Sequence, residues 1–331
     1  MTDLNHTPEY ATQKNLFDAY YETTLKPILK QNDNIRRRYL LSFTLLLLMV
    51  SVFYPYLLYQ LLCGTIPSQY IGLILCASGV LTILMCGPIY FYKKKVKPQI
   101  MPDFANFFGD FTYTFEGKVN DEVLRASELF GKYDIIVGDD FFSGVYDGVH
   151  ISIGEQKLKQ IRYEAVEQNI FSGENNRTVK RREKCIFSGI CILFEMNKNF
   201  KGRTIVLKDK GALGNALTRI KGLQNVRLED SRFEKVFEVY SDDQVEARYL
   251  LTTAFMERML KLRDLYDGKA IQFCFNRNKL LLSIPTKQNM FEANSFFCSN
   301  LNKKKIDLVF EQFYTIFSIV NLLKLNQHIG M

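Results

Sequence analysis

The distribution of charged and apolar positions divides this chain into very different parts. No charged residue occurs between Tyr39 and Tyr92, although 24% of the chain is charged. Within this stretch, residues 39–63 and 70–92 are two apolar runs, each long enough to cross a hydrocarbon core of about 30 Å as a helix. A pair of helices buried in a globular core would usually carry a polar stripe toward solvent. The pattern therefore predicts a hairpin of two membrane-spanning helices.

Basic residues flank both outer ends of this hairpin. Arg36–Arg38 precede the first run and Lys93–Lys95 follow the second, whereas the turn at 64–69 is uncharged. Basic flanks are retained on the cytoplasmic side, so we expect both termini in the cytoplasm. No ionisable side chain lies inside either run, and such groups are typical of pumps and ion pathways. The hairpin is therefore expected to be an anchor.

The segments beside the hairpin carry helical patterns. In the N-terminal arm, residues 1–38, apolar residues recur at helical spacing after the start signal Thr7-Pro8. The arm is expected to be an amphipathic cytoplasmic helix, broken or kinked at Pro27. It would either lie on the bilayer or pack against the C-terminal domain. Residues 93–130 are expected to form a helical connector.

From residue 131 the apolar positions recur with a period of two. Turn residues at Gly138-Asp139-Asp140 and Asp147-Gly148 separate short runs rich in β-branched and aromatic residues. Asp147-Gly148 is a strong signal for a tight hairpin. The predicted strands are Tyr133–Val137, Phe141–Tyr146, Val149–Ile153, Leu158–Tyr163, Lys184–Glu195 and Arg203–Leu207.

Helical patterns return toward the C-terminus. Ser241 to Gln244 reads as a capping box with Ser241 at the N-cap, and Gly268 is expected to end the helical pattern that follows. A hairpin is expected around Asn276–Asn278, and a long amphipathic helix from Ile306 to Leu323. Residues 131–331 are therefore predicted to be a cytoplasmic α+β domain built on an antiparallel sheet.

The net charge of +8 belongs entirely to the parts outside the hairpin. The anionic inner leaflet explains such a charge most simply, and nucleic acid is disfavoured because no known binding motif accompanies it. A basic segment at 175–184 is expected to be a loop between two strands, which either contacts lipid headgroups or an acidic partner or is simply solvated. Its basic residues are Arg177, Lys180, Arg181, Arg182 and Lys184.

No pattern of known chemistry is present in the sequence. The seven cysteines form no CxxC pair, and the three histidines do not stand at metal-ligand spacing. The phosphate-loop, dinucleotide and GxSxG motifs are absent. Acidic pairs at 139–140 and 242–243 are explained by a turn and by a helix start. We therefore assign no catalytic residue, no cofactor and no metal.

Several short motifs follow one another between Phe187 and Leu262. They are Phe187-Ser188-Gly189, the turn Asn197 to Gly202, and the run Val239 to Tyr249. This succession, after a two-span hairpin, resembles the bacterial DUF3137 family, a domain of unknown function. The residues of the run that carry the resemblance most specifically are Tyr240, Ser241, Asp243, Glu246 and Arg248.

The resemblance implies a bacterial inner-membrane protein and brings no established activity. The chain departs from the family pattern at Thr253, where the family usually has Pro, and matches weakly over 151–183. The leading hypothesis is a membrane-anchored cytoplasmic domain that acts as a binding or scaffold module. A membrane-tethered enzyme of unrecognised type and an accessory subunit of a transport complex remain as alternatives. The expected partners are the lipid bilayer, anionic lipid heads, and an unknown protein or a second copy of the chain.

Overall fold

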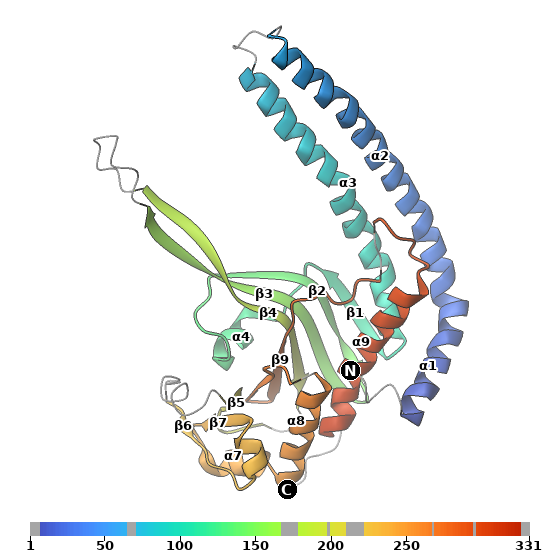
Figure 1. Cartoon of the computed structure of the whole chain (residues 1–331). Helices are drawn as coiled ribbons and strands as arrows, with labels where there is room; N and C mark the ends of the chain where they lie inside the picture. The colour runs from blue at the N-terminus through green and yellow to red at the C-terminus, as the bar shows by residue number, and fades with distance from the viewer. Residues whose placement is uncertain are drawn as a thin grey trace. The chain divides into compact units, whose positions relative to one another are not determined.

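The computed structural model describes residues 7–64, 71–166, 178–196, 199–209, 222–266, 268–293 and 296–325. The chain splits into two compact units. The hairpin unit consists of Asn15–Phe107 and Glu292–Glu311, and the sheet unit of Met1–Lys14, Phe108–Phe291 and Gln312–Met331. The protein thus combines long helices with an antiparallel sheet (Figure 1), which confirms the predicted α+β class.

Long helices dominate the hairpin unit. They are α1 (Pro8–Tyr20), whose second half belongs to this unit, α2 (Lys26–Leu62) and α3 (Ile71–Asn106). The irregularity expected at Pro27 occurs just before it, as the π-helical turn η2 (Tyr21–Leu25). Pro27 itself is the second residue of α2, which follows η2 without a break, so its missing N–H removes one hydrogen bond from a continuous helical stretch. The turn predicted between the apolar runs lies mostly outside the described residues.

One face of α1 is covered by protein. The ring of Phe17 is fully buried and stacks on Phe310 with ring centroids 4.5 Å apart. It also meets Phe107 edge to face at 5.3 Å. Of the two alternatives for the arm, packing against the rest of the chain is therefore the one that the contacts of Phe17 support.

The first half of the charge-free stretch leaves its apolar side chains uncovered. Residues 8–57 form a helical stretch that is long and apolar enough to cross a membrane, with its most apolar window unburied. Helix α9 (Lys303–Leu323) passes the same test, but 67% of its window is buried, as in the core helix of a globular domain. The α2 side chains that are more than half exposed include Leu41, Leu45, Leu48, Met49, Val52 and Phe53.

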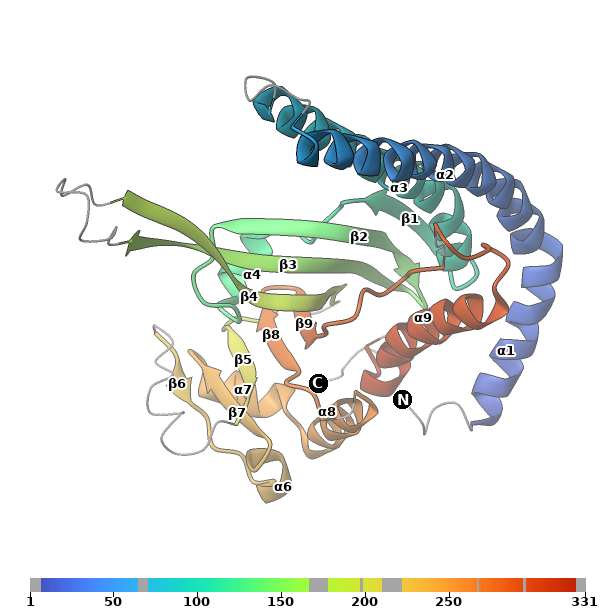
Figure 2. The same ribbon diagram turned by 45° about the horizontal axis from the view of Figure 1, so that its top comes forward.

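The sheet unit contains one mixed-length sheet of nine described strands in the order β1-β2-β3-β4-β9-β8-β5-β7-β6 (Figure 2), and the strand pairs are antiparallel. Its strands are β1 (Asp110–Phe115), β2 (Ile135–Tyr146), β3 (Val149–Val166), β4 (Thr178–Glu195), β5 (Thr204–Lys208), β6 (Gln224–Asn225), β7 (Phe237–Ser241), β8 (Gln272–Asn276) and β9 (Lys279–Pro285).

Two tight turns were predicted at the right places. Tyr146 pairs with Val149, and the intervening Asp147 and Gly148 have φ of 48° and 77°, the two positive values of a type I′ turn. Asn276 likewise pairs with Lys279. These hairpins follow from local turn chemistry and confirm the predictions.

Other predicted boundaries were wrong, because strands continue where the sequence suggested turns. The triplet at 138–140 is a bulge inside β2, where the register shifts between Gly138 and Phe141. Strand β1 falls in 93–130, where a helical connector was expected. It pairs along β2 because Phe111 packs inward while its neighbours stay outside.

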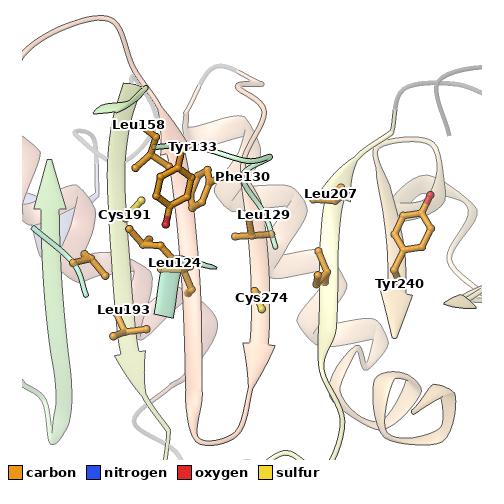
Figure 3. Close-up of a cluster of buried hydrophobic side chains, with 13 residues drawn as sticks. Leu124, Leu129, Phe130, Tyr133, Leu158, Cys191, Leu193, Leu207, Tyr240 and Cys274 are labelled. Atoms are coloured by element: carbon orange, nitrogen blue, oxygen red, sulfur yellow. The ribbon is translucent and has the colours of Figure 1, made fainter. Parts of the chain in front are cut away.

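Both faces of the sheet are covered. On one face, the connection that contains α4 (Asp121–Ser127) packs against β3, β4, β5, β8 and β9 (Figure 3). On the other, Phe313 and Phe317 of α9 contact the rings of Phe142 and Tyr146, and Phe255 contacts Phe275. The first-face cluster includes Leu124, Leu129, Phe130, Tyr133, Leu158, Cys191, Leu193, Leu207 and Cys274.

The short helix α6 (Ser231–Glu234) precedes β7. After β7, where a capping box was expected to start one helical pattern at Ser241, the chain forms two helices. They are α7 (Gln244–Leu250) and α8 (Thr253–Leu265), and Thr252 caps the second. The N-cap of α7 is Asp243, which accepts hydrogen bonds from the N–H groups of Val245 and Glu246. Ser241 was therefore wrongly predicted as the cap: it ends β7, and its hydroxyl accepts from the Asp243 N–H.

Candidate functional site

The distal part of the β3–β4 hairpin is a two-stranded arm that extends past the other strands (Figures 1 and 2). We call residues 160–166 and 178–184 the β-arm. Arg162 pairs with Arg182 and Tyr163 with Arg181 in its antiparallel register. The basic segment predicted as a loop is therefore strand from Thr178 onward, because β3 supplies backbone partners for it. Arg177 lies outside the described residues.

Strand alternation separates the charges of the β-arm onto two faces. On one face, the Glu183 carboxylate accepts from Lys159 Nζ at 3.0 Å and from Arg181 Nη2 at 3.5 Å, so these charges are compensated. On the opposite face, two arginines stand directly across from each other, an arrangement that like charges disfavour. This second face, the basic face of the β-arm, carries Arg162, Lys180, Arg182 and Lys184, and Glu164 stands across from Lys180 on the same face.

The basic face concentrates positive charge on exposed strands. Lys180, Arg182 and Lys184 are all exposed, and Tyr163, on the other face, is 70% exposed. Four cations within a short ribbon can attract phosphate groups or an acidic protein. Of the five residues predicted as a contact, three thus share one face and Arg181 lies on the other.

The family-like motif gathers at a corner between β5, β7 and α7. Glu246 accepts hydrogen bonds from the backbone N–H groups of Lys201 at 3.0 Å and Gly202 at 2.7 Å. Asp242 accepts from the N–H of Arg203 at 2.6 Å. A side chain at Gly202 would stand 2.8 Å from the Cβ of Asp243, so only glycine fits this approach. The carboxylates therefore hold the chain that enters β5.

The other motif residues complete this corner without forming a reactive group. Ser241 is fully buried and shares a hydrogen bond with the Thr204 hydroxyl at 3.0 Å. Burial and the hydrogen bond to Glu238 raise the pKa of Tyr240 to about 12, so its phenol stays protonated at neutral pH. The Arg248 guanidinium donates to Gln244 on the exposed side of α7. The motif is thus explained by the fold.

Replacing Glu246 with Ala is expected to lower the free energy of unfolding of the sheet unit by about 2–3 kcal/mol, because two backbone N–H groups lose a charged acceptor. Glu246→Gln keeps one carbonyl acceptor and should lose less. Glu257→Ala, at an exposed site within the same family-like region, is the matched control. Denaturant unfolding in mild detergent measures the differences; equal midpoints for Glu246→Ala and Glu257→Ala would contradict this role.

An acidic cluster that sequence reasoning missed lies at the bulge of β2. Carboxylate oxygens of Asp139, Asp140 and Glu155 lie within 4.8 Å of one another, and Asp140 is fully buried. Tyr113 donates to Asp140 at 2.6 Å, and the Met290 N–H donates to Glu155 at 2.9 Å. Such oxygens suit a hard cation, but these protein donors already contact the cluster. The signal available in the sequence was an acidic pair that interrupts an apolar strand.

A cavity of about 570 Å³ lies between α4 and the β8–β9 turn. Its lining includes Asn120, Ser127 and Cys274. Burial raises the pKa of the Cys274 thiol to about 12, so the thiolate needed for nucleophilic attack is scarce at neutral pH. The cavity therefore offers a space for a ligand without an activated cysteine.

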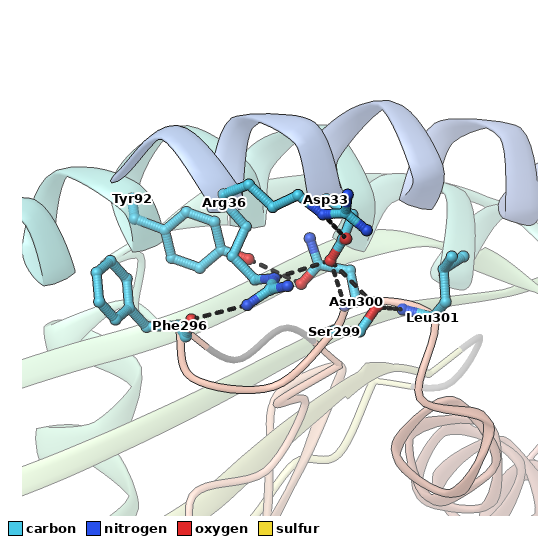
Figure 4. A network of polar contacts seen from close by, with 8 residues as sticks. Asp33, Arg36, Tyr92, Phe296, Ser299, Asn300 and Leu301 are labelled. Carbon is cyan, nitrogen blue, oxygen red and sulfur yellow. Dashed lines mark hydrogen bonds and ion pairs between the residues drawn. The ribbon is translucent and has the colours of Figure 1, made fainter. Parts of the chain in front are cut away.

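In the hairpin unit, a polar network fixes residues 296–300 against α2 and α3 (Figure 4). The Asp33 carboxylate, 4% exposed, accepts from Arg36 Nε at 2.8 Å and from the Ser299 hydroxyl and Asn300 N–H at 3.1 Å. The Tyr92 hydroxyl donates to the Asn300 carboxamide at 2.7 Å. Sequence reasoning missed this network because its members are far apart along the chain.

A second ion pair stands on α3 in the same unit. The Lys97 ammonium, 1% exposed, lies 3.0 Å from the Glu292 carboxylate. Two of the residues at the basic ends of the hairpin, Arg36 and Lys97, are therefore buried in internal pairs. Exposed positive charge remains at Arg37 and Arg38 on α2 and at Lys94 and Lys95 on α3.

Comparisons with known proteins give one family and one weak structural likeness. Residues 185–325 match the family described as "Protein of unknown function (DUF3137)". No curated protein matches the chain. A solved structure titled "crystal structure of the mycobacterial trehalose monomycolate transport factor A, TtfA" is 12% identical, with a TM-score of 0.33, over 67% of this chain and 93% of that one. A likeness this weak carries no argument.

Proposed function

We propose, from the premise that this chain belongs through residues 185–325 to the DUF3137 family of unknown function, that it is a two-pass bacterial inner-membrane protein. Both termini would lie in the cytoplasm, and residues 131–331 would form a binding or scaffold module. The arm at 1–38 and the segment 93–130 would join that module to the spans at 39–63 and 70–92.

The observation that carries the anchor is the uncovered apolar surface of α2. Leu48, Met49 and Val52 are each more than 60% exposed, next to further exposed apolar residues on the same helix. Soluble proteins rarely leave so large a continuous apolar surface in water. A hydrocarbon environment removes this cost, and a helix satisfies its own backbone groups there.

The orientation rests on the exposed basic residues at the hairpin base. Arg37 and Arg38 on α2 and Lys94 and Lys95 on α3 are exposed, although Arg37 also pairs with the Asp33 carboxylate, whereas Arg36 and Lys97 are buried in internal ion pairs. The positive-inside rule counts residues of this kind within a few turns of the span ends. Four exposed cations support a cytoplasmic base for both helices.

The binding surface that we favour is the basic face of the β-arm. Its four cations are of the type that anionic lipid headgroups or an acidic protein segment would recognise. The basic face carries four cations against the one carboxylate of Glu164, whereas Lys159 and Arg181 pair with Glu183 on the opposite face, so the basic face has the larger positive charge. Lipid phosphates are the leading candidate because the proposed anchor keeps the chain at an anionic membrane.

Accessibility of two native thiols tests the proposed topology. Cys63, at the end of α2, and Cys185, on β4, are both free and exposed. In variants that keep one of these cysteines, a membrane-impermeant maleimide should label Cys63 on intact cells and Cys185 only after the inner membrane is permeabilised.

The total label in detergent is the control for equal reactivity of the two thiols. Labelling of Cys185 on intact cells would overturn the proposed orientation. Extraction of the full chain from membranes by alkaline carbonate would overturn the anchor itself.

A further inference from the structure

The loop at Phe296–Phe297 carries exposed aromatic surface beside the start of the first span. The ring of Phe43 in α2 meets those of Phe296 and Phe297 edge to face, with centroids 5.5 Å and 5.8 Å away. Phe296 also meets Tyr92, the last residue of the second apolar run, at 5.6 Å. Phe296 and Phe297 therefore lie beside the start of the first apolar run, at Phe43, and Phe296 also lies beside the end of the second, at Tyr92.

The depth of this loop follows from the position of Phe43. That residue stands four positions into the charge-free stretch, which is about 6 Å along a helix past Tyr39. Side chains at this depth lie in the interfacial layer of a bilayer, where aromatic rings are favoured. Phe297 is 63% exposed, and one turn beyond Phe43 on the same face of α2, Leu47 is 46% exposed.

The polar network holds the loop in this position from both sides. Arg36 Nη1 donates to the carbonyl of Phe296 at 3.4 Å, and Asp33 accepts from Ser299 and Asn300. Phe297 and Cys298, between these fixed points, are both exposed. The buried hydrogen bonds thus fix the backbone and turn an apolar side chain outward, an unfavourable placement in water.

We infer that Phe297, supported by Phe296, enters the interfacial layer of the leaflet nearest the hairpin base and is a third membrane contact beside the two spans. This inference rests on the proposed membrane anchor. Lipid is the occupant because the exposed ring continues the uncovered apolar surface of α2 at the same level. A second copy of the chain on this surface is the alternative that the experiment must separate.

Tryptophan fluorescence in the full chain provides the test, because the natural sequence contains no tryptophan. Three single variants, Phe297→Trp, Met49→Trp and Tyr249→Trp, would be reconstituted in bilayers whose lipids carry a quencher near the headgroup or deep in the acyl chains. Met49 lies about 15 Å past Tyr39 and is 67% exposed. Tyr249, on α7, is 57% exposed and serves as the control in the sheet unit.

Phe297→Trp is expected to lose most of its emission to the shallow quencher and less to the deep one. Met49→Trp should show the reverse order, and Tyr249→Trp should keep its emission with both. If Met49→Trp is quenched while Phe297→Trp is not, the inference fails and the anchor stands. A blue-shifted but unquenched Phe297→Trp assigns the loop to a second copy. If neither is quenched, the proposed anchor fails as well.

The native thiol of Cys298 gives a second readout that leaves the loop sequence intact. With Cys63 and Cys185, the other exposed thiols that the structure describes, changed to Ser, a polarity-sensitive dye on Cys298 should emit at shorter wavelength in a lipid bilayer than the same dye on Cys185 in the variant that keeps that thiol. Equal emission at the two sites, together with an unquenched Phe297→Trp, would overturn the inference.

Discussion

Replacing Asp33 with Ala is expected to lower the free energy of unfolding of the hairpin unit by about 3–5 kcal/mol, since it leaves the Arg36 guanidinium buried without its partner. Arg36 and Asp33 side chains are 10% and 4% exposed, so water cannot replace the lost ion pair. The Ser299 hydroxyl and the Asn300 N–H lose their acceptor in the same step. Denaturant unfolding of the full chain in mild detergent measures the effect.

Two further variants separate the charge from the packing. The Arg37 side chain, which is 72% exposed, also pairs with the Asp33 carboxylate. Arg37→Ala should therefore lower the free energy of unfolding by less than about 1 kcal/mol. Asp33→Leu combined with Arg36→Met replaces the pair by apolar side chains and should recover the part of the stability that Asp33→Ala loses through the unpaired Arg36 charge, but not the part lost with the acceptor of Ser299 and Asn300. A double variant as unstable as Asp33→Ala would show that the loss comes from distorted packing.

The pH dependence of unfolding gives an independent check on Asp33. Burial pushes its pKa upward, but the hydrogen bonds from Arg36, Asn300 and Ser299 and the Arg36 charge outweigh burial and hold the pKa below its ordinary value. A depressed carboxyl pKa contributes stability above the ordinary value near about 4, and this stability is lost as the pH falls through the folded-state pKa. The difference between wild type and Asp33→Asn should therefore shrink on acidification.

Neutralising the basic face of the β-arm is expected to weaken binding to anionic vesicles by up to about a thousandfold. Each Lys or Arg near an anionic surface contributes about 1 kcal/mol, or about fivefold in affinity. The full chain would be held in nanodiscs of zwitterionic lipid, and co-flotation with phosphatidylglycerol vesicles would report binding. The four substitutions are Arg162→Gln, Lys180→Gln, Arg182→Gln and Lys184→Gln.

The matched control removes the same charge from elsewhere in the sheet unit. Raising the salt concentration should weaken the binding of the natural chain and leave the arm variant nearly unchanged, because exposed charges are screened. If both quadruple variants lose the same amount of vesicle binding, the effect comes from net charge and not from the β-arm. If the natural chain binds duplex nucleic acid and not the vesicles, the partner of the basic face is nucleic acid and not lipid. The control positions, all exposed, are Lys208, Lys235, Lys261 and Lys269.

Local signals accounted for the features that were predicted correctly. The Asp147-Gly148 turn needs two positive φ values, which these residues adopt at low cost whatever surrounds them. The apolar stripe from Ile306 to Leu323 forms α9 because its period matches a helix that buries one face. In each case, the information lies within a few residues of the element.

The errors occurred where a distant segment decided the outcome. Gly138-Asp139-Asp140 resembles a turn, but Tyr113 of β1 accommodates the buried Asp140 carboxylate and lets β2 continue as a bulge. The segment at 178–184 resembles a loop because of its charge, but β3 pairs with it along its whole length. Ser241 resembles a cap, but Thr204 of β5 engages its hydroxyl.

By itself, the sequence determined the charge-free stretch and hence the two long helices, because an apolar run needs no partner to be recognised. It also determined the α+β class, and it carries the motifs within the segment 185–325 that matches the DUF3137 family model. Only the tertiary structure decided which basic residues remain exposed at the hairpin base, because Asp33 and Glu292 compensate Arg36 and Lys97. It alone placed Phe297 beside Phe43, since residues more than 250 positions apart meet only when the chain folds.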